Sequence, residues 1–384
     1  MDVVHVATEC DVSVLHSPLV AHVLFRFDYG GLENGVANLI NRLPTHVARH
    51  VVISLTEATD FARRIRRPDV EVLTVRKRPG KDPGAYLRFT RLLRLLRPDI
   101  VHTRNIGTMD CQAIAALLGV PYRIHSEHGW DTTDQEGKSN KYRVLRRAMA
   151  PLIHRHVALS RELEDWLVSV ARVPRNKVVR ICNGVDTERF RPVRANRSES
   201  VVFGTVTRFS DIKDPLNTIR GFARLKELVG IDVPLKLLMV GDGPLLGAAR
   251  REIAVLGIEQ AVCLPGSQDD VQPWLQQMDV FVMGSRREGI SNTILEAMAA
   301  GLPVVATRTG GNVELVCEGS TGDLVAAQSP DALAVALRPY ALDRTLRELH
   351  GAAGRRRVVD EFSLDSMIAR YAALYAWPTK MQVD

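Results

Sequence analysis

The sequence contains few cysteines, and none of them lie close together. The count is odd, and no two have the spacing of metal ligands: Cys10, Cys111, Cys182, Cys263 and Cys317. This usage argues against a disulfide framework and against a cysteine zinc site. It is typical of a protein kept in a reducing compartment, so we expect a cytoplasmic protein.

Long apolar runs and aromatic residues are also scarce. No run of about 18 apolar residues occurs, so we predict no transmembrane helix. Residues 1–20 lack a cationic stretch before an apolar one, which argues against a signal peptide, and residues 1–18 have no assignable role. The formal charge of +7 favours anionic partners, but an aromatic content of only 5% offers little surface for stacking bases. We therefore expect nucleotide phosphates or acidic lipids rather than specific nucleic acid.

The sequence does contain a regular alternation of short apolar runs and amphipathic helical runs. Strands are predicted first at 19–27, 50–56, 70–75, 99–104, 122–127 and 156–160. After a polar interruption at 189–201, further strands are predicted at 201–208, 235–241, 261–266, 280–285 and 303–307. Buried strands that alternate with helices predict parallel sheets covered on both faces. We predict an α/β protein of two doubly wound, Rossmann-like domains that face each other across a cleft.

Ligands of such domains bind beyond the carboxyl ends of the strands, so the turns that follow strands are the candidate sites. Gly30 and Gly31 lie where a strand gives way to a helix, and glycines there let backbone N–H groups approach an anion. A simple tight turn explains the same pair equally well. Gly243 belongs to a G-x-G-x-x-x-G turn, which is not the dinucleotide fingerprint and disfavours an oxidoreductase.

Two cations and two acids stand at further strand ends. Arg208 and Lys213 precede a predicted helix start at Pro215, where a guanidinium and an ammonium suit a diphosphate. Solvated surface cations are the alternative. Glu288 precedes another helix start, and Glu296 lies one turn inside that helix, where both carboxylates can accept hydrogen bonds from hydroxyl groups. The alternative is an N-terminal acid favoured by the helix dipole together with an exposed helical glutamate. Backbone N–H groups between Glu288 and Glu296 face the positive end of the helix dipole: Gly289, Ile290, Ser291 and Asn292.

The second half of the chain resembles glycosyltransferase family 4, whose architecture is GT-B. The resemblance rests on "EGISNTILE" followed by "AMAAGLPVVAT", with "GTVTRFSDIKD", "VGDGP" and "NGVDTERFRP" in the usual order. "GGLENGVANLINRLP" and "SEHGWD" further resemble the sugar transferases of PEP-CTERM exopolysaccharide systems. The resemblance implies an N-terminal acceptor-side domain at 1–188, joined by a C-terminal helix at about 362–384. A nucleotide-sugar-binding domain is implied at 189–361.

The resemblance also implies roles for single residues. Glu296 would hold the ribose hydroxyls, and Glu288 would contact the donor sugar. Arg208 and Lys213 would stabilise the diphosphate leaving group. The N–H groups at residues 289–292 would assist, with Gly30, Gly31 and Gly243 beside the donor. Transfer with retention, from a donor that we expect to be UDP-linked, is implied, with no cofactor and no essential divalent metal.

The loop "SEHGWD" supplies the candidates on the first domain. Family members often place a histidine there that contacts sugar or acceptor, so His128 is assigned to catalysis. Glu127, Asp131 and Asn105 are candidates for acceptor contacts, and His102 is expected along the same cleft. The alternative enzyme is a sugar-nucleotide epimerase of the same architecture, against which the paired glutamates argue.

The helix predicted at 83–97 is strongly basic. Arg88, Arg91 and Arg94 recur at threefold spacing beside an apolar stripe, and 141–156 is also basic. An ordinary outer helix with solvated arginines is one interpretation. The other is peripheral contact with anionic lipid at the inner face of the cytoplasmic membrane. Such contact would bring the enzyme to a glycan or polyprenol-linked acceptor of exopolysaccharide synthesis.

Overall fold

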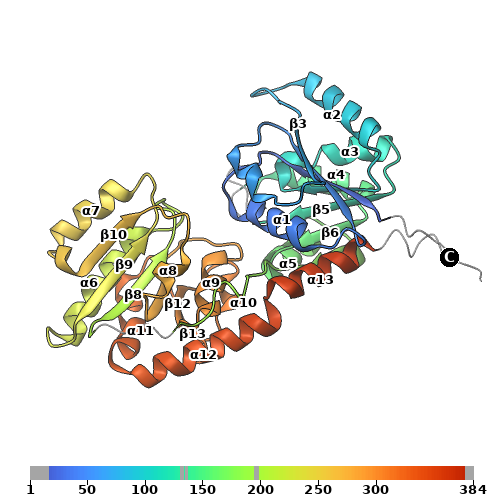
Figure 1. Cartoon of the computed structure of the whole chain (residues 1–384). Coiled ribbons are helices and arrows are strands. Elements are labelled where there is room, and N and C mark those ends of the chain that lie inside the picture. The colour runs from blue at the N-terminus through green and yellow to red at the C-terminus, as the bar shows by residue number, and fades with distance from the viewer. Residues whose placement is uncertain (1–16, 130–133, 135–136, 194–198, 377–384) are drawn as a thin grey trace, which may run out of the picture.

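The computed structural model describes residues 17–129, 134, 137–193 and 199–376. Two parallel sheets form two α/β domains, one above and to the right in Figure 1 and one below and to the left. The predicted fold class is therefore confirmed. Within the described ranges no helix is both long and apolar enough to cross a membrane.

The first sheet has seven strands in the order β3-β2-β1-β4-β5-β6-β7. Its strands are β1 Leu19–Leu24, β2 Arg49–Ser54, β3 Glu71–Thr74, β4 Ile100–Arg104, β5 Tyr122–Glu127, β6 Arg155–Ala158 and β7 Val178–Arg180. Its helices are α1 Gly31–Arg42, α2 Pro83–Leu96, α3 Cys111–Leu117, α4 Asn140–Met149 and α5 Arg161–Ser169. All neighbouring strands pair in parallel, so their carboxyl ends share one edge of the sheet.

The second sheet has six strands in the order β10-β9-β8-β11-β12-β13. Its strands are β8 Val201–Val206, β9 Leu235–Val240, β10 Val262–Gly266, β11 Val280–Met283, β12 Val304–Thr307 and β13 Gly322–Val325. Its helices are α6 Pro215–Val229, α7 Leu246–Val255, α8 Gln272–Leu275, α9 Asn292–Ala299, α10 Asn312–Leu315, α11 Pro330–Leu342 and α12 Arg344–Glu361. The starts of α6 and α11 follow from capping: Asp214 and Ser329 accept hydrogen bonds from backbone N–H groups, and proline occupies the first helical position of each.

The strands that sequence reasoning missed are the short ones at the ends of the sheets. β7 has only three residues, and β13 begins with Gly322 and Asp323, which are poor strand formers. Both are held by pairing with a longer neighbour, β6 and β12 respectively. Such strands depend on tertiary contacts and have little pattern of their own.

The last helix, α13 Leu364–Tyr375, leaves the second domain and packs on the first sheet. Figure 1 shows α12 beneath the second domain and α13 beneath the first. Tyr371 and Tyr375 are buried in a cluster with core residues of β1, β4 and β5. The linker between the two sheets, residues 181–200, crosses the start of this helix. There the Val185 N–H donates to the Phe362 backbone oxygen, and the Leu364 N–H donates to the Val185 backbone oxygen.

The crossing predicts that Gly184 cannot accept a side chain. A β-carbon on Gly184 would lie 2.7 Å from Leu364 Cα and 2.8 Å from the Ser363 oxygen, both backbone atoms. We expect Gly184→Ala to lower the free energy of unfolding by about 1–3 kcal/mol. Gly247→Ala, on the exposed side of α7, is the control and should be neutral or stabilising by up to about 1 kcal/mol. Equal Tm values for the two variants in thermal unfolding would contradict this role of the crossing.

Candidate active site

The predicted loops of the two domains meet where the carboxyl ends of the sheets face each other. A β-carbon on Gly289 would stand 3.7 Å from Gly129 Cα and from the His128 backbone oxygen. One on Gly31, at the start of α1, would stand 3.1 Å from Asn292 Nδ2. Asn183 of the linker donates to Asn292 Oδ1 at 2.8 Å. Loops that are between 109 and about 260 residues apart in sequence therefore line one site.

Glu288 is the most tightly held acid of this site. It is 8% exposed, and Lys213 Nζ lies 2.6 Å from its Oε1 and 2.8 Å from its Oε2. The buried Ser285 hydroxyl donates to Oε1 at 2.6 Å. The ion pair and this hydrogen bond offset the cost of burying the carboxylate. The two residues predicted to act on sugar and diphosphate are thus paired with each other.

The backbone around Glu288 depends on a glycine pair that sequence reasoning missed. Gly310 and Gly311 follow β12, and a β-carbon on Gly310 would lie 1.7 Å from the backbone oxygen of Glu288. The Gly311 N–H donates to the Gly289 oxygen at 2.9 Å. The signal was available, because a glycine pair directly after an apolar strand is the same pattern as Gly30–Gly31.

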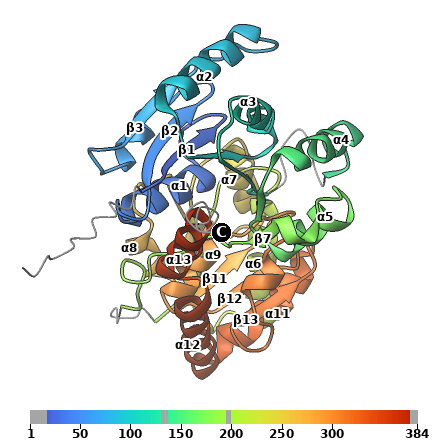
Figure 2. The same ribbon diagram turned by 90° about the vertical axis from the view of Figure 1, so that its right-hand side faces the viewer.

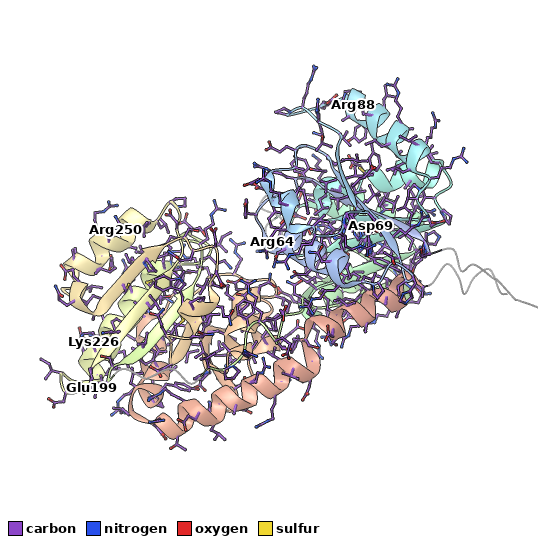
Figure 3. The ribbon with its side chains drawn as sticks, in the orientation of Figure 1. Arg64, Asp69, Arg88, Glu199, Lys226 and Arg250 are labelled. Carbon is purple, nitrogen blue, oxygen red and sulfur yellow. The ribbon has the colours of Figure 1, made fainter. Side chains whose placement is uncertain are left out.

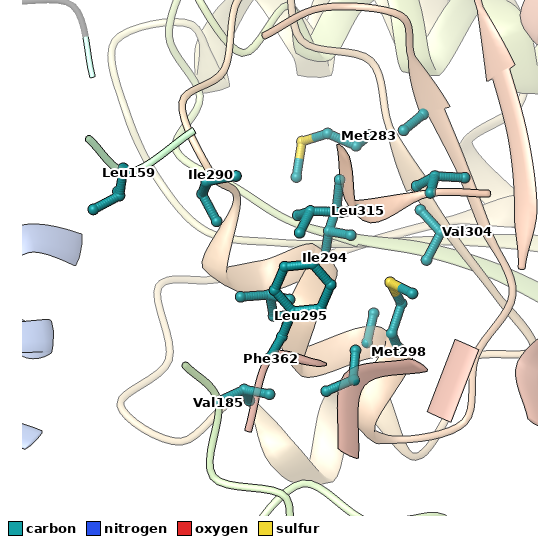
Figure 4. Packing of buried hydrophobic residues seen from close by; sticks show 14 of the residues in the cluster. Leu159, Val185, Met283, Ile290, Ile294, Leu295, Met298, Val304, Leu315 and Phe362 are labelled. Carbon is teal, nitrogen blue, oxygen red and sulfur yellow. The ribbon is translucent and has the colours of Figure 1, made fainter. Parts of the chain in front are cut away.

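Helix α9 presents its N-terminus to the site. Ser291 is its N-cap and accepts from the Ile294 N–H; the sequence had allowed either Ser291 or Asn292 as the cap. Ile290 is buried with Leu159 of the first domain, so its side chain packs between the domains (Figure 4). The dipole of α9 therefore points into the site from a helix that both domains hold in place.

Glu296 lies one turn further along α9 and lines a small pocket between the domains. Asn34, Arg64, Asn183 and Arg189 also line this pocket. Burial raises the pKa of Glu296 to about 7, Arg189 acts in the opposite direction, and Asp270 adds to the rise. Its carboxylate makes no hydrogen bond with the residues that the structure describes, and is therefore available to accept from a bound hydroxyl group.

Arg208 and Gly243 stand at the neighbouring strand ends of the second sheet. Arg208 is exposed and has no ion pair within the described ranges. Gly243 has a φ of +154°, and a β-carbon there would lie 2.5 Å from the Phe209 oxygen, so glycine lets the two loops approach closely. The Gly243 N–H is already bound to Asp242 Oδ1 at 2.6 Å. Close packing against Phe209 thus explains why residue 243 is a glycine. Arg208 remains available to bind an anion.

The glycine loop of the first domain is covered by an acid. Gly30 is the N-cap of α1, and a β-carbon on it would lie 2.2 Å from Glu33 Oε2. The Glu33 carboxylate therefore folds back over the loop that was expected beside the phosphates. Burial, the largest cause, raises its pKa, as does Asp28, while Arg104 opposes the rise.

His128 and Asn105 lie on adjacent loops after β5 and β4. Asn105 has a left-handed φ of +58°, and its Oδ1 accepts from the His128 N–H at 2.8 Å. Burial, followed by the charge of Arg104, lowers the pKa of His128 to about 3. The ring is neutral near pH 7, and its buried Nε2 has no hydrogen-bond partner among the described residues.

Glu127 lies in an ion network on the same edge. Arg146 donates to both of its oxygens, at 2.6 and 3.3 Å, and also binds Asp134 Oδ2 at 2.8 Å. Burial would raise the pKa of Glu127, but Arg146 and His125 bring it to about 2. Its carboxylate thus ties α4 to β5, and Asp131 lies outside the described residues. His102 is 0% exposed and bonded to Tyr375 and Ser126, so its placement along the cleft was wrong.

Arg104 is the charged residue that sequence reasoning did not single out. It is 2% exposed, donates to His22 Nδ1 at 2.9 Å and to the His102 oxygen at 3.2 Å, and forms no ion pair with described residues. Burial and this cation lower the pKa of His22 and of His102. No sequence pattern separates this strand-end arginine from a surface one. The described residues include no group of three or more acids, histidines or cysteines arranged to hold a metal ion.

Two protein-family models match consecutive parts of the chain. Residues 29–189 match a model described as Glycosyltransferase Family 4. Residues 200–342 match one described as Glycosyl transferases group 1. The break between them falls in the linker between the two sheets.

Similar proteins include the UDP-Gal:alpha-D-GlcNAc-diphosphoundecaprenol alpha-1,3-galactosyltransferase of Escherichia coli. It is 29% identical over 311 residues, which is 77% of this chain and 79% of that protein. A solved glycosyltransferase of Rickettsia africae has a TM-score of 0.81 at 20% identity and covers 94% of this chain and 98% of its own. HepE of Anabaena, solved with UDP and glucose, has a TM-score of 0.77 at 18% identity and covers 94% and 99%. These structures share the fold of this chain.

The raised pKa of Glu296 predicts a pH-dependent cost in stability. The folded protein keeps this proton up to about pH 7, whereas an ordinary glutamate loses it near 4.5. Stability should therefore fall as the pH rises through this window. We expect Glu296→Gln to stabilise the protein by about 1–3 kcal/mol at pH 8 and to have little effect near pH 4.5. Glu71→Gln, at the exposed first residue of β3, is the control. A gain in Tm that is the same at both pH values would show that Glu296 is not the titrating group.

Proposed function

Because the chain belongs to glycosyltransferase family 4, we propose that this glycosyltransferase moves sugar from a UDP-linked donor with retention of anomeric configuration. The acceptor we propose is a glycan or a lipid-linked sugar of cell-surface polysaccharide synthesis. The observation that carries the proposal is the Glu296 carboxylate, one turn inside α9, which makes no hydrogen bond with described residues, while Glu288 before the helix is paired with Lys213. This arrangement fits a ribose on one side and a sugar diphosphate on the other.

The donor is argued from two kinds of support. Glu296 offers two acceptor oxygens, which suits the two vicinal hydroxyls of a ribose. The name of the Escherichia coli relative states a UDP-linked galactose and a diphosphoundecaprenol acceptor, and HepE was solved with UDP and glucose. We propose UDP as the nucleotide on this basis, and a lipid-linked sugar as the class of acceptor.

Departure of the nucleoside diphosphate builds negative charge on phosphate oxygens. We propose that the exposed Arg208, the ammonium of Lys213 and the N–H groups at the start of α9 stabilise this charge. Preorganised cations and N–H donors lower such a barrier. We therefore propose that the reaction needs no cofactor and no essential divalent metal.

In this mechanism Lys213 can bind either of two anions, the Glu288 carboxylate or the diphosphate of the donor. Its Nζ is bonded to both oxygens of Glu288 in the structure. We propose that the diphosphate draws the ammonium away, which leaves the Glu288 carboxylate to accept hydrogen bonds from the donor sugar. Ser285 keeps its bond to Oε1 and retains the orientation of the acid. Glu33 would have to leave the α1 N-terminus for a phosphate to approach Gly30 and Gly31.

His128 is proposed to contact the reacting sugars from the first domain. Its low pKa keeps the ring neutral, so that one ring nitrogen can accept a hydrogen bond. The unpaired Nε2 supports this role. Asn105 holds the loop through the His128 N–H and is a positioning residue in this proposal.

The test separates nucleotide binding from transfer. Thermal shifts are measured with UDP, GDP, ADP, NAD and a short oligonucleotide, and donor turnover is followed with and without acceptor in EDTA. We expect UDP to stabilise the wild type, with the shift largely lost in Glu296→Ala. Glu288→Ala should keep the shift and lower kcat by about a hundredfold or more. Turnover of donor without acceptor would favour an epimerase, and a response to NAD alone would overturn the proposal.

Contact with an anionic membrane is proposed for the outer side of the first domain. Figure 2 shows α2, α3 and α4 along this side. Arg91 and Arg94 of α2 are exposed without ion pairs in the described ranges, and three leucines are exposed near them: Leu87 at 63%, Leu95 at 80% and Leu117 at 87%. Arg88 differs, because it donates to the Val75 oxygen and to Asp82. We propose that this surface holds the protein at the inner face of the cytoplasmic membrane, beside its acceptor.

Liposome sedimentation tests the membrane proposal. Replacing Arg91 and Arg94 together by Gln should weaken binding to vesicles with anionic lipid, since each cation near the surface contributes about 1 kcal/mol. The expected loss is about tenfold or more, with no change on neutral vesicles. Arg250→Gln with Arg338→Gln is the matched control on the second domain, where Figure 3 labels Arg250 on α7. Equal losses for the two double variants would indicate nonspecific attraction.

A further inference from the structure

The loops after β8 and β11 are joined by a second ion pair beside that of Lys213 and Glu288. Arg286 Nε lies 2.9 Å from Asp214 Oδ2, and the Arg286 N–H donates to the Ile212 oxygen at 2.8 Å. Asp214 directly follows Lys213, and Arg286 comes two residues before Glu288. Each loop therefore gives one cation and one acid, and the two pairs run in opposite directions between the same loops.

Asp214 holds an unfavourable backbone conformation. Its φ of +43° and ψ of +61° are left-handed, a region that disfavours residues with a β-carbon. The residue is 6% exposed, so its carboxylate is also removed from water. Two contacts compensate: its side chain caps α6 by accepting from the Asn217 N–H, and it pairs with Arg286. Glycine would adopt this left-handed conformation more easily than aspartate. The presence of aspartate therefore indicates that its carboxylate has a role at this position.

The pair also controls which cation reaches Glu288. Arg286 is a flexible side chain, 44% exposed, that lies two residues from this acid. While Asp214 holds its guanidinium, Lys213 is the cation bonded to Glu288. Released from Asp214, Arg286 is free to compete with Lys213 for Glu288, or for a bound phosphate. The Asp214 carboxylate therefore governs the register of the two loops and the identity of the partner of Glu288.

We propose that Asp214 and Arg286 form a clamp that positions Lys213 and Glu288 for transfer. The inference rests on the proposed function, because Lys213 and Glu288 are taken to act on the diphosphate and on the sugar. When the phosphates draw Lys213 away, the first ion pair between the loops is lost. The clamp then keeps the loops together, and Glu288 stays beside the sugar. Asp214 and Arg286 act through these neighbours and are positioning residues.

The Asp214→Gly variant distinguishes the role of the Asp214 side chain from that of its backbone conformation. Glycine relieves the left-handed conformation, and at an N-cap it is only slightly worse than Asp, so Tm should stay within about 3 °C of wild type. Without the clamp, kcat should fall about tenfold to a hundredfold, because small misplacements of reacting groups are costly. The thermal shift with UDP should persist, since Glu296 is untouched. Arg286→Gln should reproduce this loss, and the double variant should be no slower than either single one.

The matched control is Arg220→Gln. Arg220 Nε binds Glu252 Oε1 at 2.6 Å, and its side chain is 49% exposed, close to the 44% of Arg286. This pair links α6 to α7, and its loss should leave kcat and KM unchanged. Wild-type kcat in Asp214→Gly, or additive losses in the double variant, would overturn the clamp.

A readout that needs no donor keeps the clamp testable if transferase activity is absent. Urea unfolding of Lys213→Met, Glu288→Gln and the double variant measures the coupling between the two residues. We expect the coupling seen in the wild-type background to disappear in the Asp214→Gly background. Unchanged coupling would overturn the clamp whatever reaction the protein performs. A lost coupling in a protein without transferase activity would leave the clamp standing and reject the proposed function.

Discussion

The structure of the site depends on the need to neutralise Glu288, a carboxylate that is almost completely buried. Lys213 supplies the charge, Ser285 supplies a hydroxyl, and each comes from a different strand end. Both loops must then be held in register, which explains the close backbone contact at Gly310 and the ion pair between Asp214 and Arg286. The same pairing places a cation and an acid side by side at the site.

Helix α9 transmits the packing of the whole molecule to this site. Its buried face belongs to a cluster that contains residues of both domains, including Leu159, Val185 and Phe362 (Figure 4). Since the cluster spans the interface, the helix that carries Glu296 is held against the first domain as well as against its own sheet. The N-terminus of α9 therefore lies close to His128 and Gly129, with Gly289 as the point of contact.

The first domain contains a buried cation, Arg104, in contrast to the buried carboxylate Glu288 of the second. Arg104 is buried among neutral histidines and a tyrosine rather than beside an acid, and it helps to keep those rings uncharged. His128 lies within its influence and is neutral for the same reason. The neutral His128 ring belongs to the first domain, whereas Arg208 and Lys213 belong to the second, so the two domains bring different electrostatic character to the site.

The amino-acid sequence was sufficient for the features that depend on local chemistry. The periodicity of apolar runs indicated two parallel sheets, the cap of α9 was narrowed to Ser291 or Asn292, and the glycine pair at residue 30 was placed at a helix start. Contacts between distant segments required the fold. The local sequence does not indicate that Lys213 pairs with Glu288 or that Asp214 binds Arg286. Nor does it indicate that Glu127 forms an ion pair with Arg146. His102 was misplaced for the same reason: whether a strand-end side chain faces the core or the site depends on what packs over it, here Tyr375 of a helix about 270 residues away.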